Sequence, residues 1–431
     1  MGNGTPVSGS TGATVNLPMA RGVNRIPPSA KARRRGLHLA IDVPLLLAVI
    51  MLLVFGLLML YSASWDYSLM ILEEKPTFMF ERQLLWLGIG IVVVVWLAWM
   101  DYRRWQKLAL PAMAVIIVAL VAVLLSNIVV NNAARSLLGG SVRPSEAAKV
   151  VLVIYLAVWL YARREQLHDV SFGLFPLSAI LGVISGLIIL QPDLSAAAMV
   201  FILGGLLFFL AGGDTRQIVV FLVVAFVVGA IVFQLHPTGR QRLAEYRASV
   251  SDLTQAADHL ARSLEAIVRG GWVGVGIGRA ETKLTGLPVP PTDSIFAVVV
   301  EETGILGAAG LIFLYTVLLW RGLDIARRAP DGLGKLIASG LSIWITLEAL
   351  INMAVLLGLV PFAGNALPFI SYGGSSMLSN MAAVGILMSI NRQSALKSEA
   401  EERTFDAVVD LRRRNGRRRL SRTRRVPKVE R

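Results

Sequence analysis

Cysteine is absent from this chain of 431 residues, and charged residues are few. Without cysteine the chain can form neither a disulfide nor a thiolate metal site, so redox chemistry does not indicate its compartment. The four histidines lie far apart, at His38, His168, His236 and His259, which excludes the ligand spacing of a zinc site. Only 16% of the residues are charged and 55% are hydrophobic, with a mean hydropathy of +0.65. These values exclude an ordinary soluble domain.

Apolar runs recur along the whole chain, each near the ~20 residues that an α-helix needs to cross a bilayer. Short polar breaks separate the runs, which indicates one helical bundle rather than several soluble domains. We therefore predict an all-α polytopic membrane protein with about ten transmembrane helices. The runs lie approximately at residues 39–62, 84–100, 108–130, 147–162, 173–191, 194–212, 217–235, 295–320, 336–360 and 370–390.

Basic residues crowd alternate breaks between these runs, and the positive-inside rule places such breaks in the cytoplasm. The first break instead carries Asp66, Glu73, Glu74 and Glu81, which fits the opposite side. An even number of spans follows, with both termini in the cytoplasm. The basic clusters are Arg33 to Arg35, Arg103 with Arg104 and Lys107, Arg163 with Arg164, Arg321 with Arg327 and Arg328, and the C-terminal tail.

Three regions follow from this pattern. Residues 1–38 are polar and rich in Gly, Pro and Ser, which predicts a disordered basic cytoplasmic arm. Residues 39–392 form the membrane domain, with a large outer loop at 236–294 between helices seven and eight. Residues 393–431 form a basic cytoplasmic tail. Apart from Phe405 the tail has no aromatic residues for base stacking, so we expect anionic lipid or a cytoplasmic partner there and no nucleic acid.

The large outer loop contains two patterned segments. Leu253, Leu260, Leu264 and Ile267 recur at helical spacing, which predicts an amphipathic helix that lies either on the membrane surface or against the bundle. Residues 270–278 are rich in glycine, but no strand precedes them and no lysine-serine pair follows, so a nucleotide-binding loop is disfavoured. These glycines favour a tight re-entrant turn close to the bilayer.

Several ionisable residues lie within or beside the apolar runs, where a charge costs on the order of 3 kcal/mol at the bilayer midplane. Local roles explain some of them: Glu146 and Lys149 form an i,i+3 pair at a helix start, and Asp193 suits a helix cap. Asp293 suits a cap too, or a base or metal contact. The collective pattern favours a shared polar cavity open to the outside. The set comprises Arg135, Arg143, Glu146, Lys149, Asp193, Asp293, Glu301, Glu302 and Glu348.

The string from Leu367 to Ser376, LPFISYGGSS, follows Asn352 and the Gly358–Pro361 run. In this arrangement the chain resembles the FtsW/RodA group, the SEDS (shape, elongation, division and sporulation) proteins. The stretch that begins at Lys283 looks more like FtsW than RodA. Further matches keep the family's order over the whole membrane domain. They are Tyr61 to Ser64, Arg82 with Gln83, Arg135, Pro144 to Glu146 with Lys149, Gln191 to Leu194, and Thr292 to Ala297 with Glu301 and Glu302.

Some positions depart from the pattern of that family. We expect these departures to affect contacts with the substrate more than the type of reaction. Pro291 stands where a histidine usually precedes Thr292, and Glu348 stands where FtsW often has glutamine. The other departures are Ser136, Arg143, Pro290 and Arg262.

The resemblance implies an inverting peptidoglycan glycosyltransferase that polymerises lipid II, with undecaprenyl pyrophosphate as the leaving group. The site would face the outside of the bacterial cytoplasmic membrane, and septal wall synthesis in cell division is the favoured role. A RodA-type elongation polymerase and a lipid II flippase or transporter are the alternatives. The implied partners are a class B penicillin-binding protein, which is a transpeptidase, and other divisome proteins.

The resemblance also implies roles for individual residues. Asp293 would be the catalytic general base. A divalent cation, Mg²⁺ or Mn²⁺, held through Asp293 or Glu146 is an optional cofactor. The motif around Ser371 and Ser375 would either line the cavity or allow close helix packing. The substrate-binding candidates are Arg135, Glu146, Lys149, Asp193, Lys283, Ser371 and Ser375.

Overall fold

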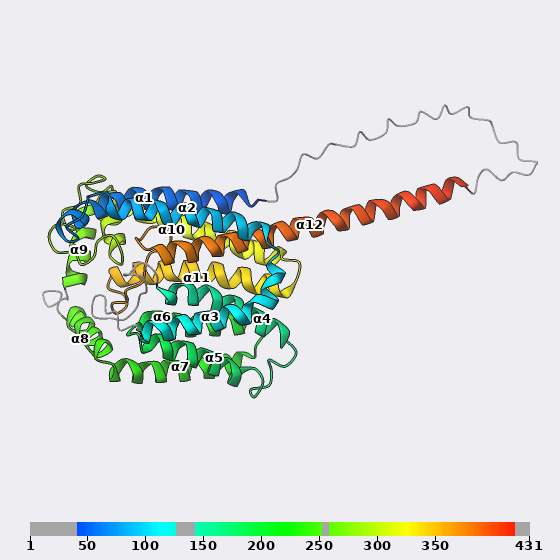
Figure 1. The fold of residues 1–431 in the computed structure, drawn as a ribbon, viewed down its shortest axis with the longest axis horizontal. Helices are drawn as coiled ribbons and strands as arrows, with labels where there is room; N and C mark the ends of the chain where they lie inside the picture. The colour runs from blue at the N-terminus through cyan, green and yellow to red at the C-terminus, as the bar shows by residue number, and fades with distance from the viewer. Residues whose placement is uncertain (1–40, 126–142, 252–257, 419–431) are drawn as a thin grey trace, which may run out of the picture. The chain divides into compact units, whose positions relative to one another are not determined.

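The computed structural model describes residues 41–125, 143–251 and 258–418, and every regular element in these ranges is a helix (Figure 1). The predicted arm at 1–38, the end of the tail and Arg135 lie outside the described residues. The helices are α1 (Val43–Met70), α2 (Phe78–Trp99), the 3₁₀ helix η1 (Tyr102–Arg104), α3 (Trp105–Leu125), α4 (Pro144–Ala162), α5 (Leu174–Ile189), α6 (Leu194–Leu210), α7 (Thr215–Leu235), α8 (Pro237–Ser251), α9 (Asp258–Gly270), α10 (Ile295–Arg328), α11 (Gly332–Leu356) and α12 (Gly374–Arg418).

Within the described residues each predicted apolar run overlaps one of these helices, which confirms the all-α polytopic membrane fold. Within the described residues, seven helical segments are long and apolar enough to cross a bilayer: α1, α2, η1 with α3, α4, α7, α10 and α11. Helices α5 and α6 are apolar but shorter, with 16 and 17 residues. Helix α12 begins inside the tenth predicted run. The number of ten spans stays a prediction.

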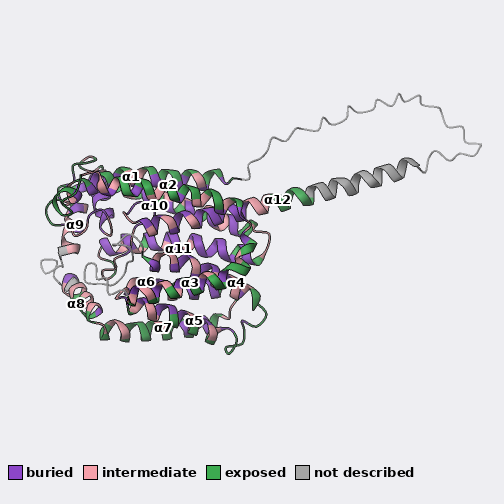
Figure 2. Ribbon diagram, in the orientation of Figure 1, coloured by how far each residue is buried: buried purple, intermediate pink, exposed green. Residues whose placement is uncertain are grey.

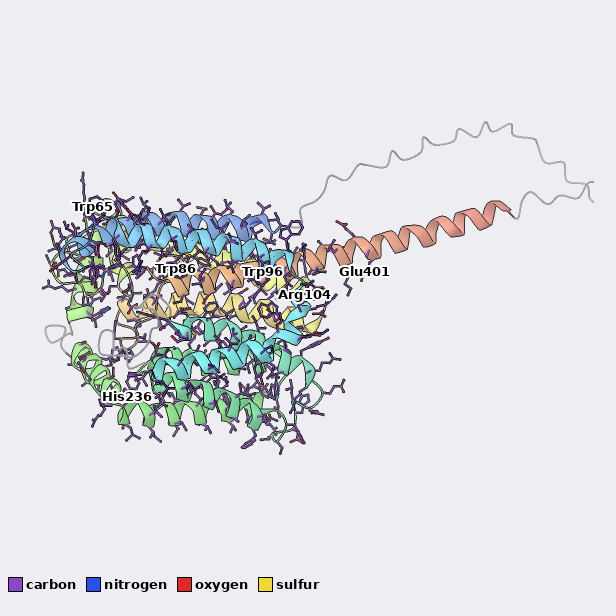
Figure 3. The ribbon with its side chains drawn as sticks, viewed as in Figure 1. Trp65, Trp86, Trp96, Arg104, His236 and Glu401 are labelled. Atoms are coloured by element: carbon purple, nitrogen blue, oxygen red, sulfur yellow. The ribbon has the colours of Figure 1, made fainter. Side chains whose placement is uncertain are left out.

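The helices run back and forth between two ends of the bundle. Figure 3 shows Trp65 and His236 at one end and Arg104 at the other. Trp65 lies late in α1 and His236 directly follows α7, whereas Arg104 follows α2. The end with Trp65 and His236 also carries α8 and α9 (Figure 1). Because these two helices belong to the predicted outer loop, this end is called the predicted outer end.

Helix α11 forms the centre of the bundle. It packs against α4, α6, α10 and α12, and 78% of its apolar window is buried (Figure 2). Helix α7 is the opposite case, with 11% of its window buried and a row of exposed valines. Lipid is as apolar as valine or leucine, so exposed apolar side chains carry no penalty in a bilayer. Helix α7 is thus suited to face lipid, whereas α11 is suited to carry polar residues.

Helix α10 is interrupted at Gly304, where φ is 70°. A break inside a bilayer is tolerated only where other groups bond to the freed amides and carbonyls. The glycine-rich segment at 270–278 supplies the bonding partners. Its close approach requires glycine, because a Cβ at Gly274 would lie 2.2 Å from the Glu302 carbonyl oxygen. The amide-to-carbonyl bonds are Ile305 to Gly271 (2.9 Å), Leu306 to Trp272 (3.1 Å), Val275 to Glu301 (2.9 Å) and Gly276 to Glu302 (3.1 Å).

Helix α9 lies against the bundle, in contact with α10 and α11. Ser263 and Ala266 are buried on its inner side, and Leu260 touches Gly358. Of the two arrangements expected for an amphipathic helix in the large loop, the structure has the packed one for α9. Leu253, the first residue of the expected pattern, lies outside the described residues.

At the end opposite to α8 and α9, Asp42 joins α1 to α10. Its side chain is 2% exposed, accepts two hydrogen bonds from Arg321 (3.1 and 2.6 Å) and lies 3.4 Å from Arg328. Burial by itself raises the pKa of the Asp42 carboxyl. The bonds from Arg321 and the Leu45 amide, with the charges of both arginines, outweigh burial and hold the pKa below its usual value. Asp42 therefore stays ionised and anchors the start of α1.

We expect Asp42→Asn to lower the free energy of unfolding by roughly 2 kcal/mol at pH 7, because a charged hydrogen-bond acceptor is lost beside two arginines. Thermal unfolding of the protein in detergent measures the loss. Since the folded pKa lies below the unfolded value of about 4, this stabilisation is present above that pH and is lost as the pH falls through the folded pKa. Asp324→Asn is the matched control.

Asp324 pairs with the same two arginines but is 30% exposed, so its replacement should cost no more than about 1 kcal/mol. Equal losses in the two variants would contradict a special role for Asp42.

Candidate active site

The segment from Pro288 to Asp293 enters α10 at the predicted outer end, and its backbone is held at almost every residue. Prolines at 288, 290 and 291 remove amide donors there, so the segment cannot form a regular helix. Its carbonyls accept bonds instead. The donors are Ser294 Oγ to Pro288 (2.6 Å), the Thr292 amide to Val289 (3.1 Å), the Tyr372 amide to Pro291 (2.9 Å), Ser371 Oγ to Thr292 (2.8 Å) and Asn352 Nδ2 to Asp293 (2.9 Å). The backbone position of Asp293 is thereby defined by α11 and by the 367–376 motif.

Ser371 connects two parts of this arrangement. Its hydroxyl donates to the Thr292 carbonyl and accepts from the Leu367 amide (2.7 Å). Gln83 of α2 forms two hydrogen bonds with the backbone at 371–373. Its Nε2 donates to the Ser371 carbonyl (3.3 Å), and its Oε1 accepts from the Gly373 amide (3.2 Å). The structure therefore places Ser371, predicted as a substrate contact, in bonds that hold the Asp293 segment.

The motif that contains Ser371 is fixed against α1 and α10 as well. The Tyr315 hydroxyl donates to the Pro368 carbonyl (2.6 Å). At Gly56 of α1, a Cβ would lie 2.5 Å from the Phe369 carbonyl oxygen, so the close approach needs glycine. The expected close packing is present, and the motif also borders the Asp293 segment.

The Asp293 side chain is half-buried and lies against Gly364, where a Cβ would be 2.8 Å from its Oδ2. Asn352, which is 1% exposed, also donates to the Asn365 carbonyl (2.6 Å), next to Gly364. One amide group on α11 thus holds the backbone of Asp293 and the segment that faces its carboxylate. A carboxylate that is partly shielded from water but still accessible is a suitable general base.

Lys149 of α4 lies between two carboxylates inside the bundle. Its Nζ is 2.9 Å from Glu146 and also forms an ion pair with Glu348 of α11. The three side chains are 3%, 12% and 1% exposed, respectively. Glu348, which was not among the predicted substrate-binding residues, is therefore the second partner of Lys149. The charge of Lys149 is compensated within the protein, which supports a structural role for Lys149 beside any contact with substrate.

The remaining predicted site residues have local partners. Asp193 caps α6 by accepting from the Ala196 amide (3.2 Å) and the Ser195 hydroxyl (3.0 Å). Lys283 is 5% exposed, and its Nζ bonds to Ser62 (3.1 Å) and lies 3.4 Å from Glu302. Ser375 Oγ accepts from the Arg143 amide (3.1 Å), which ties α12 to the start of α4.

No three histidine, aspartate or glutamate side chains gather to hold a metal ion in the part of the chain that the structure describes. Glu146, one of the two predicted ligands, is already paired with Lys149. A divalent cation thus finds no ready-made set of ligands among these residues.

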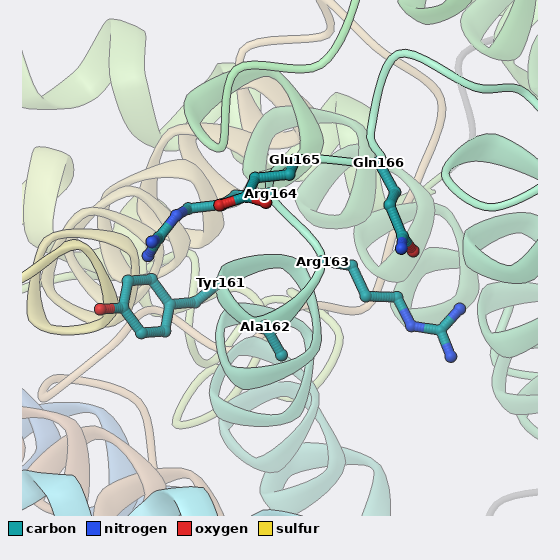
Figure 4. A pocket seen from close by; sticks show the side chains of 6 residues that line it. All are labelled: Tyr161, Ala162, Arg163, Arg164, Glu165 and Gln166. Atoms are coloured by element: carbon teal, nitrogen blue, oxygen red, sulfur yellow. The ribbon is translucent and has the colours of Figure 1, made fainter.

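A cavity of about 270 Å³ lies at the C-terminal end of α4, whereas Glu146 and Lys149 lie near its N-terminal end (Figure 4). Its walls are Tyr161, Ala162, Arg163, Arg164, Glu165 and Gln166. Helix α4 has 19 residues, about 28 Å at 1.5 Å per residue, so its ends reach opposite sides of the bundle. This cavity is therefore separate from Glu146 and Lys149 and from the Asp293 segment.

Residues 43–396 match a protein family described as cell cycle protein, FtsW/RodA/SpoVE. The chain is 34% identical to stage V sporulation protein E of Bacillus subtilis, with 82% of this chain and 97% of that protein covered. It is also 34% identical to a probable peptidoglycan glycosyltransferase FtsW of Legionella pneumophila, with 81% and 91% covered.

Solved structures share the fold. A chain of a peptidoglycan synthase complex, described as coordinating polymerization and crosslinking, is 26% identical with a TM-score of 0.68, covering 82% of this chain and 98% of that one. The rod shape determining protein RodA of Thermus thermophilus is 25% identical with a TM-score of 0.62, covering 83% and 98%.

The Lys149 network predicts unequal effects of two substitutions on stability. Lys149→Met should lower the free energy of unfolding by about 3–5 kcal/mol, because it leaves a buried carboxylate uncompensated. Glu348→Gln retains a hydrogen-bond acceptor for Lys149, and Lys149 keeps its pairing with Glu146. This variant should therefore lose only about 1 kcal/mol of unfolding free energy. Thermal unfolding in detergent compares them, and a smaller loss for Lys149→Met than for Glu348→Gln would refute this assignment.

Proposed function

The chain belongs to the FtsW/RodA/SpoVE family, and from this we propose that it is a peptidoglycan glycosyltransferase that polymerises lipid II. The observation that carries the proposal is Asp293, whose carboxylate is half-buried at the predicted outer end and whose backbone is bonded to α11 and to the 367–376 motif. Relatives named probable peptidoglycan glycosyltransferase FtsW support this activity.

In the proposed reaction, the C4 hydroxyl oxygen of the acceptor sugar attacks the anomeric carbon of the donor. Asp293 takes the hydroxyl proton as this bond forms, and the bond from the anomeric carbon to the diphosphate oxygen breaks. Undecaprenyl diphosphate leaves with the bonding electrons, and the configuration at the anomeric carbon inverts. The undecaprenyl chain lies in lipid and the sugars lie outside, so a site at the outer end of a helical bundle suits both parts.

The negative charge of the leaving diphosphate needs compensation. Arg135, outside the described residues, is our candidate for direct contact. Lys149 is committed to Glu146 and Glu348, so we propose that it holds α4 and α11 in place beside the site and leaves the diphosphate charge to other groups. Glu146, Asp193, Lys283, Ser371 and Ser375 have the structural partners described above, and we propose that they shape the site. We assign no step to a divalent cation.

We propose further that the chain works in septal wall synthesis in the cytoplasmic membrane of a bacterium, with both termini in the cytoplasm. Relatives named FtsW are 31–34% identical to this chain, which supports the role in division. The match to a chain of a peptidoglycan synthase complex supports a transpeptidase partner of the class B penicillin-binding type.

The test is polymerisation of purified lipid II by the purified chain, with and without its transpeptidase, followed by analysis of glycan length. Asp293→Asn should lower the rate at least about 100-fold, since loss of a general base costs 10²–10⁴. Its thermal unfolding should stay close to that of the unmodified chain.

Asp214→Asn is the matched control, because Asp214 caps α7 at the Arg216 amide and should leave polymerisation intact. Full activity of Asp293→Asn would refute the assignment. Movement of lipid II across vesicles without polymerisation would instead indicate the flippase.

A further inference from the structure

His259, near the start of α9, lies beside the catalytic candidate although its sequence position suggests no connection to it. Its imidazole Nε2 is 2.9 Å from the hydroxyl of Ser294, the residue directly after Asp293. Ser294 is fully buried, and its hydroxyl donates to the Pro288 carbonyl (2.6 Å). That bond uses the only hydrogen of the hydroxyl, so Nε2 of His259 must donate to Ser294 Oγ. His259 is thus the Nε2–H tautomer.

The ring of His259 also contacts the segment that faces Asp293. It packs on Phe362 with 4.2 Å between ring centroids, and the guanidinium of Arg242 lies 5.2 Å from the Phe362 ring centroid. Phe362 is two residues before Gly364, which touches the Asp293 carboxylate. His259 therefore reaches both sides of that carboxylate: the backbone that bears it and the segment against which it rests.

Because the His259 ring is buried, it can position Asp293 without adding a positive charge beside it. Burial lowers the pKa of His259 from 6.5 to about 4, so the imidazole is neutral near pH 7. A cation next to Asp293 would favour the ionised carboxylate and make it a weaker base. A neutral donor fixes the geometry and adds no charge beside Asp293.

We propose that His259 is a positioning residue for Asp293, which couples α9 to the catalytic segment through the hydrogen bond to Ser294 and the contact with Phe362. The proposal rests on the proposed function, because its effect is read in lipid II polymerisation. Small displacements of a reacting group cost much in rate, up to about 100-fold for 1 Å. The coupling should therefore appear in kcat rather than in KM.

The experiment compares His259→Leu, which removes the donor, with His259→Gln, whose side-chain amide can donate to Ser294. We expect His259→Leu to lower kcat about 10-fold or more, with KM for lipid II within about two-fold. His259→Gln should recover a substantial part of kcat. His168→Leu and His168→Gln, at an exposed histidine after α4, are the matched controls and should leave both constants unchanged.

A double-mutant cycle with Ser294→Ala tests the route of the effect. If the hydrogen bond to Ser294 carries it, His259→Leu should change kcat little once Ser294 is alanine. Unchanged kcat in His259→Leu, or equal losses in the Leu and Gln variants with fully additive effects in the cycle, would overturn the proposal. An unmodified chain that does not polymerise lipid II would refute the proposed function instead, so the two failures can be told apart.

Discussion

The lack of water within a bilayer governs this structure more than any single contact, since each backbone amide and carbonyl at that depth needs a partner in the protein. Helices meet the requirement by themselves, and two irregular places meet it by other means. At Gly304 the broken backbone of α10 bonds to the glycine-rich segment at 270–278. Between Pro288 and Asp293 the carbonyls bond to donors from α11 and from the 367–376 motif. At both of these places a second segment is bonded to the irregular backbone.

The same requirement applies to charge. Lys149 lies between Glu146 and Glu348, Lys283 lies beside Glu302, and Asp42 binds Arg321 and Arg328. The Lys149–Glu348 pair and the pairs of Asp42 join helices that are far apart in sequence, so these buried charges hold the bundle together. The expected outer cavity shared by many charged groups stays a prediction, and Asp293 with its surroundings is our candidate for its reacting part. Uncharged groups contribute bonds that position Asp293, among them Asn352, Ser371, Ser294 and His259.

Much of the fold was predictable from the sequence. Hydropathy located every apolar helix, because a bilayer selects runs of about 20 apolar residues whatever their neighbours. The LPFISYGGSS string and the order of the other matches led to the family, and Asp293 stood out as a carboxylate after three prolines. The glycines of 270–278 indicated a tight turn. The bonds of that turn to α10 could not be predicted, since they depend on where a helix breaks.

What the sequence by itself determined is the set of helices and the family, since both are recorded in local composition and in short motifs. Only the tertiary structure decided which residues far apart in the chain lie together. Glu348 lies 199 residues after Lys149, and Ser371 lies 79 residues after Thr292. His259 reaches Ser294 across 35 residues that include the glycine-rich turn. Such contacts depend on how helices pack, and packing depends on the shapes of many side chains at once, which no local pattern in the chain records.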